Sequence, residues 1–191
     1  MKRKLLTTIA LSTLWLFLTG CGASVRGTVT YFYDSVPPAK GTTVAVITKG
    51  DQAKSLEWDV YKTQIETQLE HAGFVITSSG SQPDLVCTAL YSMDAAGDTR
   101  TRAVPLYGRN GVVLGVRNVT TQVHQRVLIL QFFKHKSDAE KGNRPVAEIR
   151  VLSEGSSSEL ASVMPALTKI AFAKWPGKEG KTYDESAPLG N

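Results

Sequence analysis

The chain has 191 residues, of which 42% are hydrophobic and 20% are charged, and its formal net charge is +5. This length is sufficient for one domain that buries a substantial core. It excludes the class of very small domains that need disulfides or bound metal ions to remain folded. Composition alone favours a single globular domain.

The first 20 residues have the order of a signal peptide. Met1 to Lys4 are basic apart from the initiator, and the stretch from Leu5 to Leu18 is almost wholly apolar. Those 14 residues would span roughly 21 Å as a helix, whereas a membrane helix must cross about 30 Å of hydrocarbon. The segment therefore predicts export and removal of residues 1–20 rather than a permanent membrane helix.

The tetrapeptide Leu18-Thr19-Gly20-Cys21 resembles the lipobox of bacterial lipoproteins. The resemblance implies that Cys21 becomes the first mature residue and carries acyl chains such as palmitate, which anchor the protein in a membrane. Gly22 in place of Asp at the second mature position implies transfer to the outer membrane, with the domain in the periplasm.

Removal of residues 1–20 changes the charge and cysteine counts. The mature chain of 171 residues has 19 basic and 17 acidic residues, a net charge of +2. Cys87 is then the only thiol left for the folded domain, so no internal disulfide can form. We expect Cys87 to be buried and inert; a reactive thiol is the alternative.

The next segments predict two strands and a helix. Residues 25–33 and 43–48 are rich in β-branched or aromatic residues, and prolines and glycines lie between them. Ser55 is a candidate N-cap, Gly73 a candidate stop, and apolar residues recur between them at three and four residue spacing, which predicts a helix over residues 56–72.

The remaining pattern is mostly β. Strands are expected at 74–77 and 84–93, and a loop at 95–102. Three further runs suggest an antiparallel meander, and the charged break between the last two reads as an exposed hairpin loop. These segments are 111–119, 123–133 and 146–152, with the loop at 134–144. Residues Ser156 to Ser158 offer caps for a last helix, in which Pro165 could cause a kink.

The predicted fold class is α+β, with a small, mostly antiparallel sheet and two helices packed on one face, preceded by a lipoprotein signal peptide. The expected domain boundaries are a signal peptide, a lipidated N-terminus with the first strand and a linker, an α/β domain, and a flexible C-terminal tail. They fall at residues 1–20, 21–42, 43–177 and 178–191.

Several local features resemble the domain-of-unknown-function 4136 (DUF4136) lipoproteins of Gram-negative envelopes. They are the lipobox, the strand before Ser55-Leu56-Glu57, Tyr61, Gly73-Phe74, Pro83-Asp84-Leu85-Val86, and a closing helix that runs into Trp175-Pro176-Gly177. The resemblance implies an envelope lipoprotein, and none of these features is a catalytic signature. The stretch Tyr91-Ser92-Met93-Asp94 departs from the turn-forming motif of that family.

The sequence contains no recognisable catalytic, cofactor or metal motif. The three histidines, His71, His124 and His135, lack metal-ligand spacing with a carboxylate or cysteine partner. His71 is expected to favour the C-terminus of its helix, where a cation is stabilised. The expected sets of catalytic residues, cofactors and metal ligands are therefore empty.

Positive charge is concentrated in one block. Residues 99–150 carry ten basic and three acidic residues, a net charge of +7. Five arginines form a possible patch for an anionic ligand: Arg100, Arg102, Arg109, Arg117 and Arg126. Lipopolysaccharide, peptidoglycan or an envelope protein could be the partner, whereas nucleic acid is not expected. The alternative is a solvated face that protects a sheet edge from aggregation.

The sequence thus predicts a lipid-anchored, non-enzymatic binding or assembly module of the cell envelope that faces the periplasm. A lipid-anchored envelope hydrolase, with a site assembled only in three dimensions, is the alternative. The oligomeric state is left open.

Overall fold

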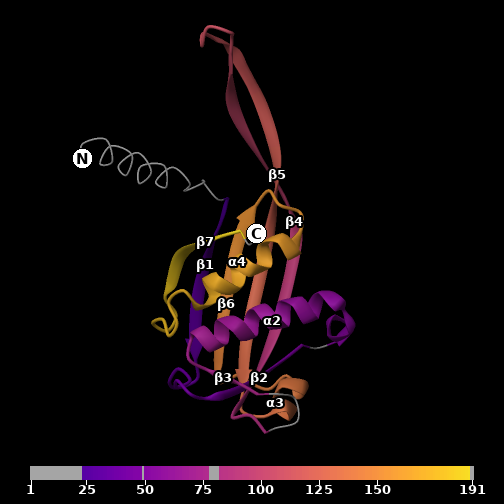
Figure 1. The fold of residues 1–191 in the computed structure, drawn as a ribbon, viewed down its shortest axis with the longest axis vertical. Helices are drawn as coiled ribbons and strands as arrows, with labels where there is room; N and C mark the ends of the chain where they lie inside the picture. Colours follow the sequence, from indigo (N-terminus) through magenta and orange to yellow (C-terminus); the bar gives the residue numbers. More distant parts are fainter. Residues whose placement is uncertain (1–22, 49, 78–81, 190–191) are drawn as a thin grey trace, which may run out of the picture.

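The computed structural model describes residues 23–48, 50–77 and 82–189. The predicted signal peptide and Cys21 lie outside these described residues. Seven strands form one mixed sheet in the order β3-β2-β4-β5-β6-β1-β7 (Figure 1). The strands are β1 Ser24–Tyr33, β2 Thr43–Ile47, β3 Val75–Ile76, β4 Leu85–Tyr107, β5 Val113–Phe133, β6 Ala147–Gly155 and β7 Thr182–Pro188. The helices are η2 Gly50–Lys54, α2 Leu56–His71, α3 Lys136–Lys141 and α4 Leu160–Phe172.

The sheet is mostly antiparallel. Strand β2 pairs in parallel with both β3 and β4, while the β4–β5, β5–β6, β6–β1 and β1–β7 pairs are antiparallel. The parallel β2–β3 pair follows from α2, because a helix that links two neighbouring strands returns the chain in the same direction. The α+β class and the mostly antiparallel sheet are confirmed.

Helix α2 forms as its local sequence predicts. The Ser55 side chain accepts a hydrogen bond from the Glu57 backbone N–H at 3.2 Å, and Gly73 takes a left-handed φ of 98° just beyond the helix. Trp58, Tyr61, Ile65 and Leu69 are its buried residues. The helix and its apolar stripe are confirmed.

The core lies where α2 and α4 meet alternate residues of the sheet. One cluster joins the four buried residues of α2, the apolar face of α4, and inward residues of β1, β2, β4, β5 and β6. Figure 1 shows both helices crossing in front of the strands. Helix α3 is an additional, short element of six residues. It occupies part of the segment expected to be only a hairpin loop.

The strand and loop boundaries predicted for the middle of the chain were wrong. Residues expected as a loop, 95–102, belong to β4. The runs 111–119 and 123–133 are joined in the single long strand β5, apart from residues 111–112, which lie in the turn before it. Strands β4 and β5 pair from Val86↔Phe133 to Tyr107↔Val113, with register shifts between Ala95 and Thr99 and between Leu106 and Tyr107. They form one hairpin that extends far beyond the rest of the sheet (Figure 1).

The C-terminal segment is not a free tail. Strand β7 pairs with β1 over seven residues, and Ala187 is buried. The Tyr183 ring lies edge-on to Tyr31, with centroids 6.0 Å apart. The predicted domain boundaries therefore need correction, because β1 and β7 belong to the same sheet as residues 43–177.

Tyr31 connects this edge to the core. Its hydroxyl donates to the Ala171 carbonyl at 3.1 Å and accepts from the Lys174 backbone N–H at 3.3 Å. Burial raises the pKa of Tyr31 to about 12, because the charged phenolate would lose its hydration. The end of α4 is thus tied to β1 by a neutral buried hydroxyl.

Truncation after Gly177 should destabilise the domain, because it removes the β1–β7 ladder and uncovers Tyr31. We expect a loss of about 2–3 kcal/mol and a fall in Tm of roughly 5–10 °C, measured by circular dichroism. Removal of residues 190–191 alone is the control and should leave Tm unchanged. An unchanged Tm after truncation at Gly177 would show that the segment contributes nothing to the fold.

Candidate functional site

The outer part of the β4–β5 hairpin, residues 99–122, is called the arm here. Within the described residues it is a two-stranded ribbon, because the β5–β6 pairing ends at His124↔Gly155 and the β2–β4 pairing ends at Ile47↔Thr88. The arm turns at residues 108–112, where the Gly108 N–H donates to the Val112 carbonyl at 2.7 Å and Gly111 takes φ 74°. Its side chains are exposed or at most half-buried.

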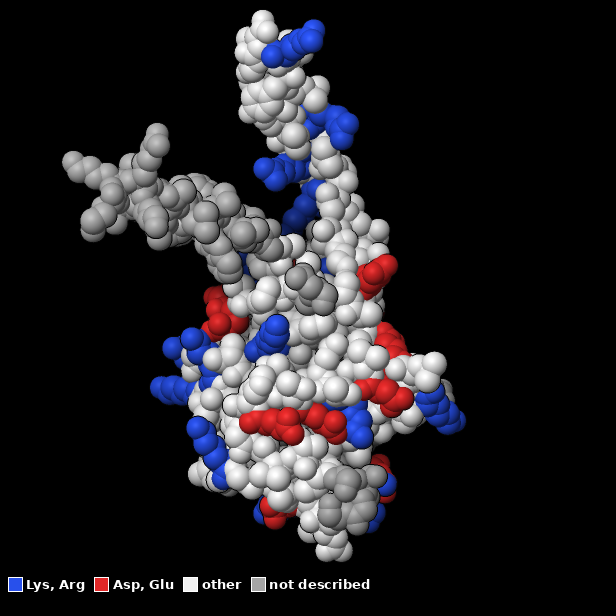
Figure 2. All heavy atoms as spheres, in the orientation of Figure 1, with Lys and Arg blue, Asp and Glu red and all other residues white. Residues whose placement is uncertain are grey.

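The arm is uniformly basic. It contains four of the five predicted patch residues, Arg100, Arg102, Arg109 and Arg117, and no Asp or Glu. All four are exposed. In the face shown in Figure 2, the projecting arm carries blue side chains and no red ones, whereas the body carries both. The structure therefore brings these four arginines together on one projection.

The end of the arm is also apolar, which the sequence analysis missed. Exposed large apolar side chains gather there: Val104, Leu106, Tyr107, Val112, Val113, Leu114 and Val116. Tyr107 is 66% exposed and Leu114 is 74% exposed. Two β-rich runs flanking Gly108 and Gly111 are a sequence signal for a hairpin turn, and that signal would have located this tip.

The fifth predicted patch residue, Arg126, lies elsewhere. It pairs with Met93 and Ser153 in the sheet and is only 3% exposed. Its Nη2 donates to the Ser157 carbonyl at 2.9 Å, and burial lowers the pKa of its guanidinium. Among the described residues its buried Nε has no hydrogen-bond partner. Arg126 is therefore a buried cation beneath the segment that leads to α4, separate from the surface of the arm.

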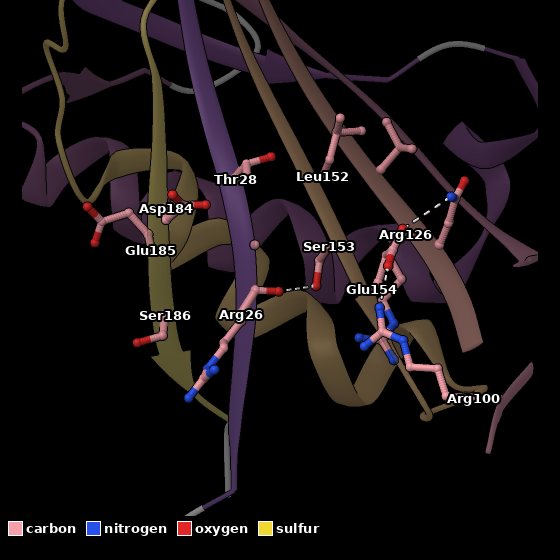
Figure 3. A pocket seen from close by; sticks show the side chains of 13 residues that line it. Arg26, Thr28, Arg100, Arg126, Leu152, Ser153, Glu154, Asp184, Glu185 and Ser186 are labelled. Carbon is pink, nitrogen blue, oxygen red and sulfur yellow. Dashed lines mark hydrogen bonds and ion pairs between the residues drawn. The ribbon is translucent and has the colours of Figure 1, made fainter. Parts of the chain in front are cut away.

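A groove of about 890 Å³ lies at the base of the arm (Figure 3). Arg26, Arg100 and Arg126 contribute to its lining, and so do Glu154, Asp184 and Glu185. Arg100 Nη2 is 2.9 Å from Glu154 Oε2, and Gln125 Nε2 donates to Glu154 Oε1 at 3.3 Å. The groove thus has mixed charge, and part of that charge is already internally paired. It provides a weaker case for anion binding than the arm does.

Among the serines, threonines and cysteines of the described residues, Thr43 bonds to a carboxylate and so resembles a nucleophile with a base. Thr43 Oγ1 donates to Asp84 Oδ2 at 2.6 Å, and the Thr43 backbone N–H donates to the same oxygen at 2.9 Å. These bonds hold the pKa of Asp84 below its usual value. A general base works best with a pKa near the working pH, so this pair is suited to joining β2 to β4 rather than to proton transfer.

The other residues considered for chemistry have separate positions. Cys87 is buried in β4, and burial raises the pKa of its thiol, as expected for an inert cysteine. His71 lies in the last turn of α2, as predicted, and His135 precedes α3. Across residues 23–48, 50–77 and 82–189, no three His, Cys, Asp or Glu side chains are grouped to hold a metal ion. Over the same ranges, no helix has the length and hydropathy needed to cross a membrane.

Comparisons with known proteins identify the fold only. No family model and no curated protein matches the chain. A PDZ domain protein from Parabacteroides distasonis is similar in structure, with TM-score 0.54 and 14% identity, over 92% of this chain and 42% of that protein. This chain therefore spans less than half the length of that protein. A PelC variant from Paraburkholderia phytofirmans, crystallised as a dodecamer, gives TM-score 0.41 and 15% identity, over 76% of this chain and 95% of PelC.

Charge-reversal variants should show that Arg126 contributes to the stability of the fold and that the exposed arginines of the arm do not. Arg126→Glu places an acid in a buried site that faces the Ser157 carbonyl, so we expect a loss of about 3 kcal/mol or more in the free energy of unfolding, measured by urea denaturation. Arg117→Glu, in the exposed arm, is the matched control and should change it by less than about 0.5 kcal/mol. Equal effects of the two variants would contradict this division.

The pair between Thr43 and Asp84 should be visible in the pH dependence of stability. A carboxyl with a lowered pKa in the folded state stabilises the fold above its unfolded pKa and loses that effect as the pH falls through its folded value. Asp84→Ala should therefore lower Tm at pH 7, with a difference from wild type that shrinks below about pH 4. Thermal melts of both proteins across that range would show it. A difference independent of pH would mean that the carboxylate charge is not involved.

Proposed function

We propose that this protein is a lipid-anchored, non-enzymatic protein of the cell envelope, attached to the outer membrane through acylated Cys21. Its α+β domain faces the periplasm and acts as a binding or assembly module. We also propose that α2 and α4 together form one layer on a single face of the sheet, as in the fold predicted from the sequence. The similarity of the local motifs to DUF4136 lipoproteins supports this assignment.

The observation that carries the binding role is the arm. Four exposed arginines lie on a projection that contains no Asp or Glu and does not contribute to the core; one of them, Arg100, pairs with Glu154 at its base. A positive field on a projecting element attracts anionic partners, and guanidinium groups bind phosphates and carboxylates in a bidentate manner. Lipopolysaccharide, peptidoglycan and acidic envelope proteins all offer such groups.

The alternative, an envelope hydrolase, lacks a comparable supporting observation in the described residues. The Ser, Thr and Cys side chains that form hydrogen bonds there do so with backbone, hydroxyl, amide or carboxylate groups, and the bonds between Thr43 and Asp84 fit a structural clamp. We therefore favour binding over hydrolysis.

Cys21→Ser should abolish lipid attachment, because the hydroxyl cannot replace the thiol as the acyl acceptor. We expect the variant to move from the membrane to the soluble fraction and to lose labelling by a fatty-acid probe in cells. Cys87→Ala is the matched control, since it removes the other thiol and should leave both readouts unchanged. A Cys21→Ser variant that still takes up the probe would refute the anchor.

A further inference from the structure

We propose that the tip of the arm, residues 104–116, inserts into the interface of an anionic lipid bilayer, and that this bilayer is the membrane to which Cys21 is attached. The inference rests on the proposed function for the anchor, and it names the ligand of the arm as a lipid surface. The argument uses the distribution of apolar side chains, the charge, the position of the arm and its length.

The apolar side chains of the tip lie on both faces of the ribbon. Successive residues of a strand point to opposite faces, so Val104 and Leu106 lie on one face, while Val116, which pairs with Pro105, lies on the other. A flat protein surface would cover one face and leave the other in water. A lipid interface surrounds an inserted element on all sides, so it accounts for apolar residues on both faces.

The charge of the arm fits an anionic surface. Arg117 pairs with Val104, three positions from Tyr107, and is therefore about 10 Å from the end of the ribbon. That distance places its guanidinium at the headgroups when the tip enters the acyl boundary by about 5–10 Å. The side chain of Arg109, in the turn, is long enough to return to the headgroups, and a tyrosine at the tip suits the interface.

The arm and the lipid anchor leave the same end of the sheet. The register Gly27↔Ser153, Ser153↔Arg126 and Arg126↔Met93 places the start of β1 beside the base of the arm, as Figure 1 also shows. At most about 11 Å of extended chain separate Ser24 from Cys21. A membrane that holds the acyl chains of Cys21 therefore faces the end of the domain from which the arm projects.

The arm cannot pass through the hydrocarbon. A two-stranded ribbon has two edges with unpaired backbone N–H and C=O groups, and these groups have no partners in lipid tails. Eight residues from Arg100 to Tyr107 extend roughly 26 Å, which is longer than the roughly 11 Å of chain between Ser24 and Cys21. The arm therefore lies oblique to the surface, so that its tip and the acyl chains of Cys21 enter the same membrane. The arm is thus a second, reversible contact beside the permanent lipid.

The test uses the lipidated chain in vesicles, with a polarity-sensitive nitrobenzoxadiazole label on Val112→Cys in the turn. Buried Cys87 and acylated Cys21 should not take the label. In vesicles of phosphatidylethanolamine and phosphatidylglycerol, we expect blue-shifted emission and protection from a soluble quencher. A label on Leu56→Cys, at the exposed start of α2, should stay accessible.

Two sets of substitutions test the two parts of the arm. The triple variant Arg102→Gln, Arg109→Gln and Arg117→Gln should lower insertion by about a hundredfold, since each basic side chain near an anionic surface is worth about fivefold. Arg100 is retained because it pairs with Glu154. Lys134→Gln, Lys136→Gln and Lys141→Gln remove the same charge near α3, at the opposite end of the sheet, and should have no effect.

The apolar part is tested by Tyr107→Asn with Leu114→Asn, which should restore access of the quencher at the turn while Tm stays unchanged. A turn label that remains accessible on a properly lipidated chain would overturn the inference and leave the anchor intact. Protection that depends on added lipopolysaccharide, peptidoglycan or protein would also overturn it. Failure of lipidation itself would instead refute the proposed function.

Discussion

The pairing of β4 with β5 is the interaction on which the rest of the structure depends. At its inner end it carries Cys87, Ala89, Leu128, Leu130 and Phe132 into the core, where α2 and α4 cover them. At its outer end the same ladder continues without a neighbouring strand and becomes the arm. An isolated two-stranded hairpin is marginal in water. Here the arm grows from a ladder already fixed by the core, so its register and direction are set before any partner is present.

The helices could be predicted from the sequence because their signals are local. Ser55, the apolar stripe and Gly73 define α2 within nineteen residues, and the structure has the helix in that place. The extent of the strands depended on distant partners. Residues 95–102 contain Asp, Gly and Thr and predict a loop, yet β5 pairs with them across a register shift. Strand β7 was missed for a similar reason. Its polar residues alternate with Tyr183 and Ala187, which lie on the same face. An edge strand needs to pack only one face against the core, so most of its residues can be polar.

Counting charges along the chain placed arginines in one predicted patch, although the strand pairing puts them in different parts of the structure. Arg117 and Arg126 are nine positions apart on one strand, yet one is exposed on the arm and the other is buried beside Ser157. A linear count cannot distinguish them, because burial depends on where β6 stops pairing with β5. The apolar tip was overlooked for the opposite reason. Its valines and leucines look like ordinary core strand residues until the structure shows that no second layer within its described residues covers them.

The direction of β1 would bring the proposed lipid anchor close to the base of the arm. Because β1 is antiparallel to β6, and β6 to β5, the start of β1 lies at the end of the sheet where β4 leaves the core and β5 returns. A reversed β1 would place the proposed anchor near α3, about the length of the sheet away from the base of the arm. The same topology leaves the arm outside the core cluster, so its residues can match a ligand without affecting the packing of the domain. Exposed valines and a tyrosine beside arginines would be costly on a surface that met only water. The proposed lipid interface would offset that cost, and the proposed acyl chains on Cys21 would keep that interface within reach.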